Sequence, residues 1–152
     1  GHGRVTVANG CGRRYRRGMS FERVLPAMLA AANALPYDYD HGNGVDFEPY
    51  PQFQDAKENR SWIQAWTGNQ ELDGHEYRVF GQDGTGGLVA LWLVREDQPL
   101  EAQPIVFFGS EGAVGVVARN LDDYLWLLAG GLGPQWPIRH DCRWRAPPCL
   151  PV

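Results

Sequence analysis

Four short apolar runs follow one another in the second half of the chain, and turn residues bound each of them. The runs are rich in β-branched, aliphatic and aromatic residues, a composition typical of strands. The predicted strands span residues 76–80, 87–95, 104–109 and 113–119. Because sequential strands joined by short turns usually pair as neighbours, the sequence predicts an antiparallel meander of four or more strands.

The first helical pattern covers residues 20–35 and begins at Ser20, a residue type that caps helix N-termini. An apolar face then recurs at helical spacing, formed by Phe21, Leu25, Met28, Leu29 and Ala32. Pro26 leaves two alternatives open. The helix either starts near Leu25 with Pro26 in its first turn, or it is kinked at Pro26.

Two further helices are predicted from their ends. Residues 55–67 begin at Asp55, and Glu58 follows three residues later, a pattern that resembles a capping box. Asn120 is predicted to cap a third helix, which ends at Gly130. Together with the strands, these helices predict an α+β domain whose helices pack on one face of the sheet.

The stretch FGQDGTGG, residues 80–87, holds enough glycine to suggest a phosphate-binding loop. A P-loop also needs a Lys within the motif, and the chain has a single Lys, Lys57. A dinucleotide-binding loop should lead into a helix, but a strand-like run follows. The stretch therefore predicts a hairpin turn, with Asp83-Gly84 supplying positive φ angles.

Residues 37–54 are predicted as a loop rich in Tyr, Phe, Asp, Gly and Pro. Rigid aromatic residues among acidic ones suit contact with a protein partner. The alternative, that these rings pack under the sheet, stays equally open. The residues predicted to contact a partner are Tyr37, Asp38, Asp40, Asp46, Glu48, Tyr50 and, from the hairpin turn, Asp83.

Charge is unevenly distributed along the chain. Residues 19–133 hold six basic and seventeen acidic residues, a net charge of −11, whereas residues 1–18 carry +5 and residues 134–152 carry +2. An acidic domain repels nucleic acid and attracts basic proteins, although acidity also serves solubility alone. No apolar run approaches the ~18 residues of a membrane span, so no membrane partner is expected.

The two ends of the chain lack periodic patterns. Residues 1–18 are predicted as a disordered basic extension. Three interpretations stay open: a scar of a removed purification tag, upstream sequence translated from a misassigned start before Met19, or an arm that contacts nucleic acid or membrane. Residues 134–152 are Pro-rich and predicted as a disordered tail, either natural or translated in a shifted frame. The predicted domain is therefore residues 19–133.

No grouping of residues that catalysis or metal binding requires is recognisable. The serines lack a G-x-S-x-G context, and the acidic residues of the 37–54 loop lack EF-hand spacing. His140, Cys142 and Cys149 lack the fourth ligand of a structural zinc site. Three cysteines near the ends do not form a disulfide framework and fit a reducing cytoplasm. The sequence predicts no enzyme, no metal and no cofactor.

The segments FGQDGTGGLVALWLV and PIVFFGSEGAVGVVARNLDDYLWLLAGG together resemble the SUKH superfamily. Residues 76–131 match its layout of strands, Gly turns and capped helix, and residues 35–67 look like its lead-in. The resemblance implies a single α+β domain that binds a protein. Bacterial members are cytoplasmic immunity proteins that block a toxin, often a nuclease. The fungal cell-wall-assembly regulator implies the alternative, a regulatory or scaffold module without a toxin partner.

Overall fold

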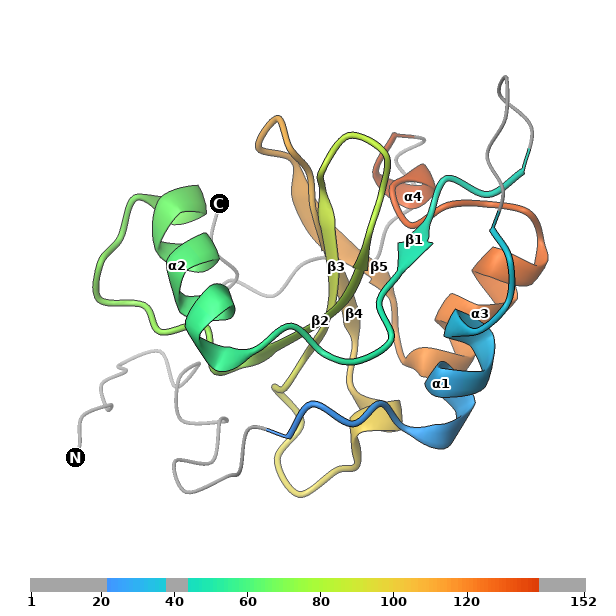
Figure 1. The fold of residues 1–152 in the computed structure, drawn as a ribbon, viewed down its shortest axis with the longest axis horizontal. Helices are drawn as coiled ribbons and strands as arrows, with labels where there is room; N and C mark the ends of the chain where they lie inside the picture. The colour runs from blue at the N-terminus through green and yellow to red at the C-terminus, as the bar shows by residue number, and fades with distance from the viewer. Residues whose placement is uncertain (1–21, 38–43, 140–152) are drawn as a thin grey trace.

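The computed structural model describes residues 22–37 and 44–139 (Figure 1). The strands are β1 (Glu48–Pro49), β2 (Tyr77–Gln82), β3 (Leu88–Trp92), β4 (Ile105–Phe108) and β5 (Val114–Ala118). The helices are α1 (Ala27–Asn33), α2 (Ala56–Thr67), α3 (Leu121–Ala129), α4 (Trp136–Arg139) and the 3₁₀-helix η3 (Leu100–Ala102). The predicted α+β class is confirmed.

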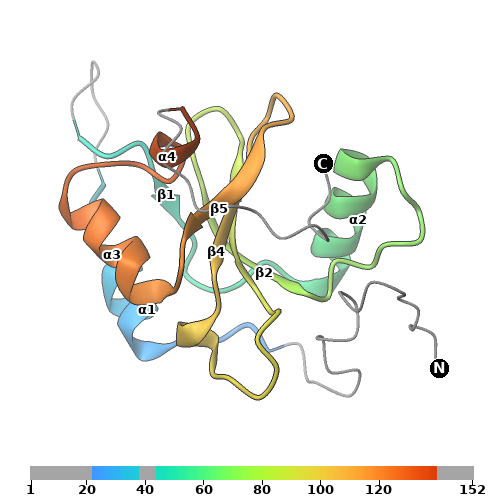
Figure 2. The same ribbon diagram turned by 180° about the vertical axis from the view of Figure 1, so that it is seen from behind.

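The five strands form one antiparallel sheet in the order β1-β2-β3-β4-β5, so the predicted meander is confirmed (Figure 2). Each of the four predicted strands is present. The fifth strand, β1, lies inside the segment predicted as a loop, where Glu48 pairs with Gln82 and Pro49 with Gly81.

The outer edge of β2 is closed by the chain on either side of β1. The backbone N–H of Tyr50 donates to the Phe80 carbonyl at 3.0 Å, and that of Gln54 donates to the Val79 carbonyl at 3.0 Å. The Asn33 side-chain amide also donates to the Phe80 carbonyl, at 3.2 Å. Helix α1 and the segment before α2 are therefore tied to the edge of the sheet.

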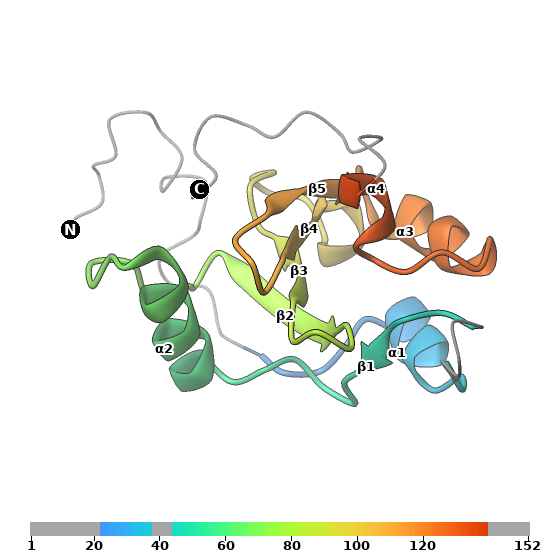
Figure 3. The same cartoon turned by 90° about the horizontal axis from the view of Figure 1, so that it is seen from above.

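The helices pack on both faces of the sheet, so the prediction of one covered face is wrong. Figure 3 shows α1 and α3 on one side of the strands and α2 on the other. Val89 and Leu91 of β3 join the apolar cluster that contains α1 and α3, whereas Ala90 and Trp92 join the cluster that contains Ile63 of α2. Every residue of β3 is consequently buried. Such a strand carries a continuous apolar run instead of an alternating one.

The helix ends follow their capping residues. The Asp55 carboxylate accepts a hydrogen bond from the Glu58 backbone N–H at 2.7 Å, and Gly68 closes α2 in the left-handed conformation. The Asn120 side chain accepts from the Asp123 backbone N–H at 2.9 Å at the start of α3. Of the two alternatives for α1, the later start is closer to the structure, because Pro26 is the residue immediately before the helix.

Residues 134–139 were assigned to the C-terminal tail, but they fold against the domain. They contain α4, and Ile138 packs against the cluster that contains α1 and α3. Pro134 and Pro137 are buried. The packed domain therefore extends beyond residue 133, to at least Ile138.

Candidate protein-binding surface

The turn between β2 and β3 is built around the Asp83 side chain. Its Oδ1 accepts hydrogen bonds from the Thr85 backbone N–H at 3.0 Å, the Thr85 hydroxyl at 2.7 Å and the Gly87 backbone N–H at 2.8 Å. The predicted hairpin is confirmed, but the positive φ angle lies at Gly86 (91°), not at Asp83-Gly84. Asp83 is only 1% exposed, so its predicted role as a partner contact is wrong.

Asp46 was predicted to contact a partner, but both of its carboxylate oxygens accept hydrogen bonds from within the protein. Oδ1 accepts from the Gly84 backbone N–H at 2.8 Å, and Oδ2 accepts from the Gln135 side-chain amide at 3.1 Å. The residue is half-buried. Its carboxylate therefore holds the β2–β3 turn and the segment before α4 in place.

Tyr37 packs under the sheet, as the alternative for the loop rings stated. Its ring lies edge-to-face against Phe47 with centroids 5.2 Å apart, and its hydroxyl donates to the Ala32 carbonyl at 2.8 Å. Burial raises the pKa of this phenol. The predicted contacts Asp38 and Asp40 lie outside the described residues.

Glu48 and Tyr50 remain at the surface, joined through Gln82. The Gln82 amide donates to Glu48 Oε1 at 2.9 Å, and the Tyr50 hydroxyl donates to Gln82 Oε1 at 2.7 Å. The pKa of Tyr50 is raised by burial and, secondly, by the negative charges of Glu48 and Glu58. Glu58, on α2, therefore belongs electrostatically to the same surface as Glu48 and Tyr50.

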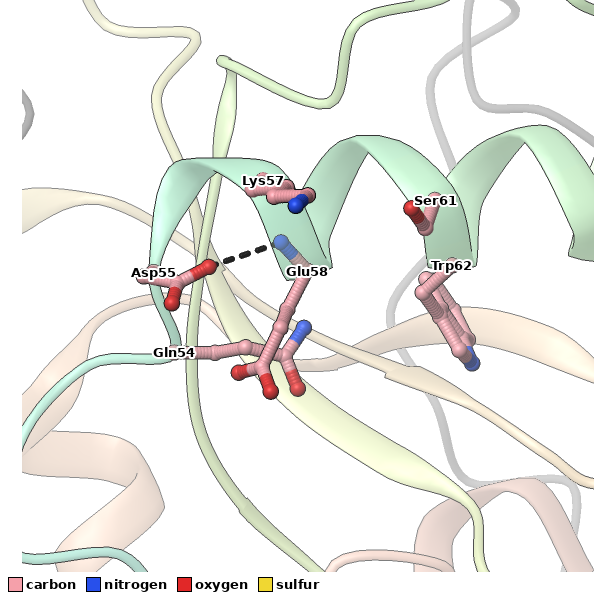
Figure 4. A pocket seen from close by; sticks show the side chains of 6 residues that line it. All are labelled: Gln54, Asp55, Lys57, Glu58, Ser61 and Trp62. Atoms are coloured by element: carbon pink, nitrogen blue, oxygen red, sulfur yellow. Dashed lines mark hydrogen bonds between the residues drawn. The ribbon is translucent and has the colours of Figure 1, made fainter.

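A hollow of about 590 Å³ lies beside the first turns of α2 (Figure 4). Its lining residues are Gln54, Asp55, Lys57, Glu58, Ser61 and Trp62. Glu58 and Trp62 extend from the same side of the helix, whereas Lys57 and Ser61 leave it in another direction. Sequence reasoning missed this hollow, because it assigned Glu58 to a helix cap and Trp62 to an apolar helix edge.

Acidic side chains outnumber basic ones at the surface of the described residues, where the exposed basic residues are Lys57, Arg60, Arg95 and Arg119. The described residues include fifteen acidic and seven basic residues, and ten of the acidic ones are exposed. The guanidinium groups are largely engaged by the protein itself. Arg23 donates to the Phe53 carbonyl at 2.8 Å, buried Arg78 to the His75 carbonyl at 2.6 Å, and Arg119 pairs with Asp123 at 2.6 Å. Among the described residues, ten exposed acidic residues therefore stand against four exposed basic ones, so this surface is net acidic.

Two further properties bear on the class of site. Within residues 22–37 and 44–139, no group of three or more His, Cys, Asp and Glu residues is arranged to hold a metal ion. Nor is any helix in these ranges long and apolar enough to cross a membrane. Comparison with protein-family models, curated proteins and solved structures finds no match to this chain.

Proposed function

We propose that this chain is an immunity protein of the cytoplasm, which binds a basic protein toxin and neutralises it without catalysis of its own. The observation that carries the proposal is the excess of exposed acidic residues, because ten of them face solvent in the described part of the chain against four exposed basic residues. The resemblance of residues 76–131 to the SUKH superfamily supports the same function. The surface that we assign to the toxin contains Glu48, Tyr50 and Glu58.

The physical argument rests on complementarity. A toxin that cuts nucleic acid must bind phosphates, so its active face is expected to carry Lys and Arg. An acidic surface attracts that face over several ångströms and accelerates association. Once bound, it occupies the groups that would otherwise hold the nucleic acid. No cofactor or metal is required for inhibition of this kind.

The test uses the full chain as bait against lysate and secretome of the native host, at about 50 and 500 mM salt. We expect a basic toxin domain to be captured at low salt and largely released at high salt. The distance over which exposed charges interact falls from above about 10 Å at the lower salt concentration to between about 3 and 8 Å at the higher one. The purified toxin must then lose its activity when the chain is added. Captured partners whose binding does not depend on salt concentration, or a partner without toxicity, would instead favour the regulatory or scaffold module.

Charge-reversal variants connect this result to the surface. The double variant Glu48→Lys/Glu58→Lys is expected to bind the toxin about tenfold more weakly or worse, mainly through slower association. Glu111→Lys is the matched control, because Glu111 is an exposed acid in the β4–β5 turn. Equal effects of all three substitutions would show that only net charge matters and that the assigned surface is wrong.

A further inference from the structure

The hollow beside α2 combines a carboxylate with the indole of a tryptophan. Glu58 and Trp62 are four residues apart on α2, so they are neighbours on one face of the helix. Figure 4 shows both side chains extending to the same side, and Gln54 lines the same hollow. A hollow lined in this way offers negative charge, an amide oxygen and a π surface together.

Trp62 is held firmly although part of it is exposed. Its ring stacks on Trp66 with centroids 6.0 Å apart and meets Phe108 edge-to-face at 4.9 Å. The Trp66 indole N–H in turn donates to the Gly109 carbonyl at 3.2 Å. A ligand that lies against the Trp62 ring therefore meets a surface whose position is already fixed, and little entropy is lost on binding.

The side-chain oxygens of Gln54 and Glu58 accept no hydrogen bond from the described residues. The Gln54 amide nitrogen donates to Asn59 Oδ1 at 2.9 Å, and its oxygen accepts no hydrogen bond from a described residue. The Glu58 carboxylate likewise makes no hydrogen bond or ion pair with described residues, because only its backbone N–H is engaged, by Asp55. Both groups can accept hydrogen bonds from a ligand.

The charge of the hollow selects a cation. An anion would ordinarily seek the N–H groups at the start of a helix, but Asp55 already caps this one and is itself negative. The hollow is lined by two carboxylates, Asp55 and Glu58, and by one ammonium group, that of Lys57. Lys57 leaves the helix in a different direction from Glu58 and Trp62. Guanidinium and ammonium groups bind both carboxylates and aromatic faces.

We propose that this hollow receives an arginine or lysine side chain of the protein partner, with the cation between the Glu58 carboxylate and the Trp62 indole. The inference rests on the proposed function, since it names the group of the basic partner that this surface recognises. Arginine fits best, because its planar guanidinium donates to Glu58 and Gln54 while it stacks on the ring.

The test is an NMR titration of the full chain with N-acetylarginine amide, at constant ionic strength, monitored at the Trp62 indole N–H. The Trp62→Phe spectrum assigns that signal. N-acetylcitrulline amide is the matched neutral ligand, because it replaces the guanidinium by an uncharged urea of the same shape. We expect saturable shifts of the Trp62 signal with the arginine compound and much smaller shifts with the citrulline compound.

Glu58→Gln should weaken the apparent affinity for the arginine compound about twofold to fivefold, the range of an exposed ion pair. Glu71→Gln, which removes an exposed acid beyond the end of α2, is the control and should leave the affinity unchanged. The inference is overturned if the two ligands give equal shifts, if no saturable shift occurs, or if both substitutions act alike.

The outcomes for the hollow and for the proposed function are separable. A captured toxin whose affinity is unaffected by Glu58→Gln would refute the cation site and leave the immunity function standing. Saturable arginine binding that depends on Glu58, without any toxin partner, would support the cation site and refute the immunity function.

Discussion

Asp46 and Gly84 are 38 positions apart in the chain, yet Asp46 Oδ1 accepts a hydrogen bond from the Gly84 backbone N–H at 2.8 Å. The second oxygen of the same carboxylate accepts from Gln135. The Asp46 side chain therefore connects the segment before β1 with the β2–β3 turn and with the segment that leads to α4.

Loss of this carboxylate is expected to destabilise the fold. Asp46→Ala leaves the Gly84 N–H and the Gln135 amide without their acceptor, at a cost of about 1–2 kcal/mol in the free energy of unfolding. Urea denaturation measures this, and Asp46→Asn should lose less because it keeps one acceptor oxygen. If Asp46→Ala were as stable as Glu111→Ala, an exposed control, the carboxylate would have no structural role.

Gly81 is required by close packing. A Cβ atom at this position would overlap the Phe47 ring, which is fully buried. Gly81→Ala is expected to lower the free energy of unfolding by about 1–3 kcal/mol, the usual range for overpacking. Gly130→Ala is the matched control, since its nearest neighbour, the Leu127 carbonyl oxygen, would be 3.5 Å away. Equal losses in both variants, measured by thermal unfolding, would contradict the packing argument.

The hydroxyl of Tyr124 is buried and has no hydrogen-bond partner among the described residues, and burial of an unpaired hydroxyl costs free energy. Tyr124→Phe is therefore expected to keep or raise the free energy of unfolding, by up to about 1 kcal/mol. Tyr37→Phe provides the contrast, because its hydroxyl donates to Ala32 and its removal should cost about 1 kcal/mol. Chemical denaturation of the two variants side by side decides the point: a larger loss in Tyr124→Phe would reveal an internal acceptor.

Glu76 should make stability fall as pH rises. Burial, and secondly the Asp73 carboxylate, raise the pKa of Glu76 from 4.5 to about 7. Between these values the unfolded chain releases a proton that the folded chain retains, so the free energy of unfolding decreases with pH across this window. Below pH 4.5 both states are protonated and the penalty is absent.

Glu76→Gln removes that penalty, so it should stabilise the protein by about 1–2 kcal/mol at pH 8 and have little effect at pH 4. Urea denaturation at several pH values checks the difference between the variant and the parent. The matched control is Glu71→Gln, whose side chain is exposed. A stabilisation that is independent of pH would contradict the titration of Glu76.

The strands and the helix ends were predictable because their signals are local. Asp55 and Asn120 cap helices through bonds that span only three residues, and the apolar runs of β2 to β5 are contiguous. The two covered faces also left a signal, since residues 88–93 contain no polar position. A run without polar positions predicts a strand that is buried on both faces.

What the sequence did not predict depends on distant partners. Strand β1 has two residues, one of them Pro49, and exists only because β2 lies beside it. In the sequence, Asp83 is indistinguishable from an exposed acid in a turn. In the structure, its carboxylate accepts hydrogen bonds from the backbone of that turn and is buried by it. Of the predicted capping box, the structure forms the bond from the Glu58 backbone N–H to Asp55, whereas the Glu58 carboxylate lies beside the hollow.

The closed edge of β2 has a consequence for how the protein behaves at high concentration. Strands with unpaired backbone groups recruit strands of other molecules and start edge-to-edge aggregation. Here Tyr50, Gln54 and Asn33 occupy the acceptors of Phe80 and Val79, and the covering segment contains Pro49 and Pro51, which have no N–H to offer. This side of the sheet is therefore protected against templated fibre growth, and any partner that docks here must recognise side chains.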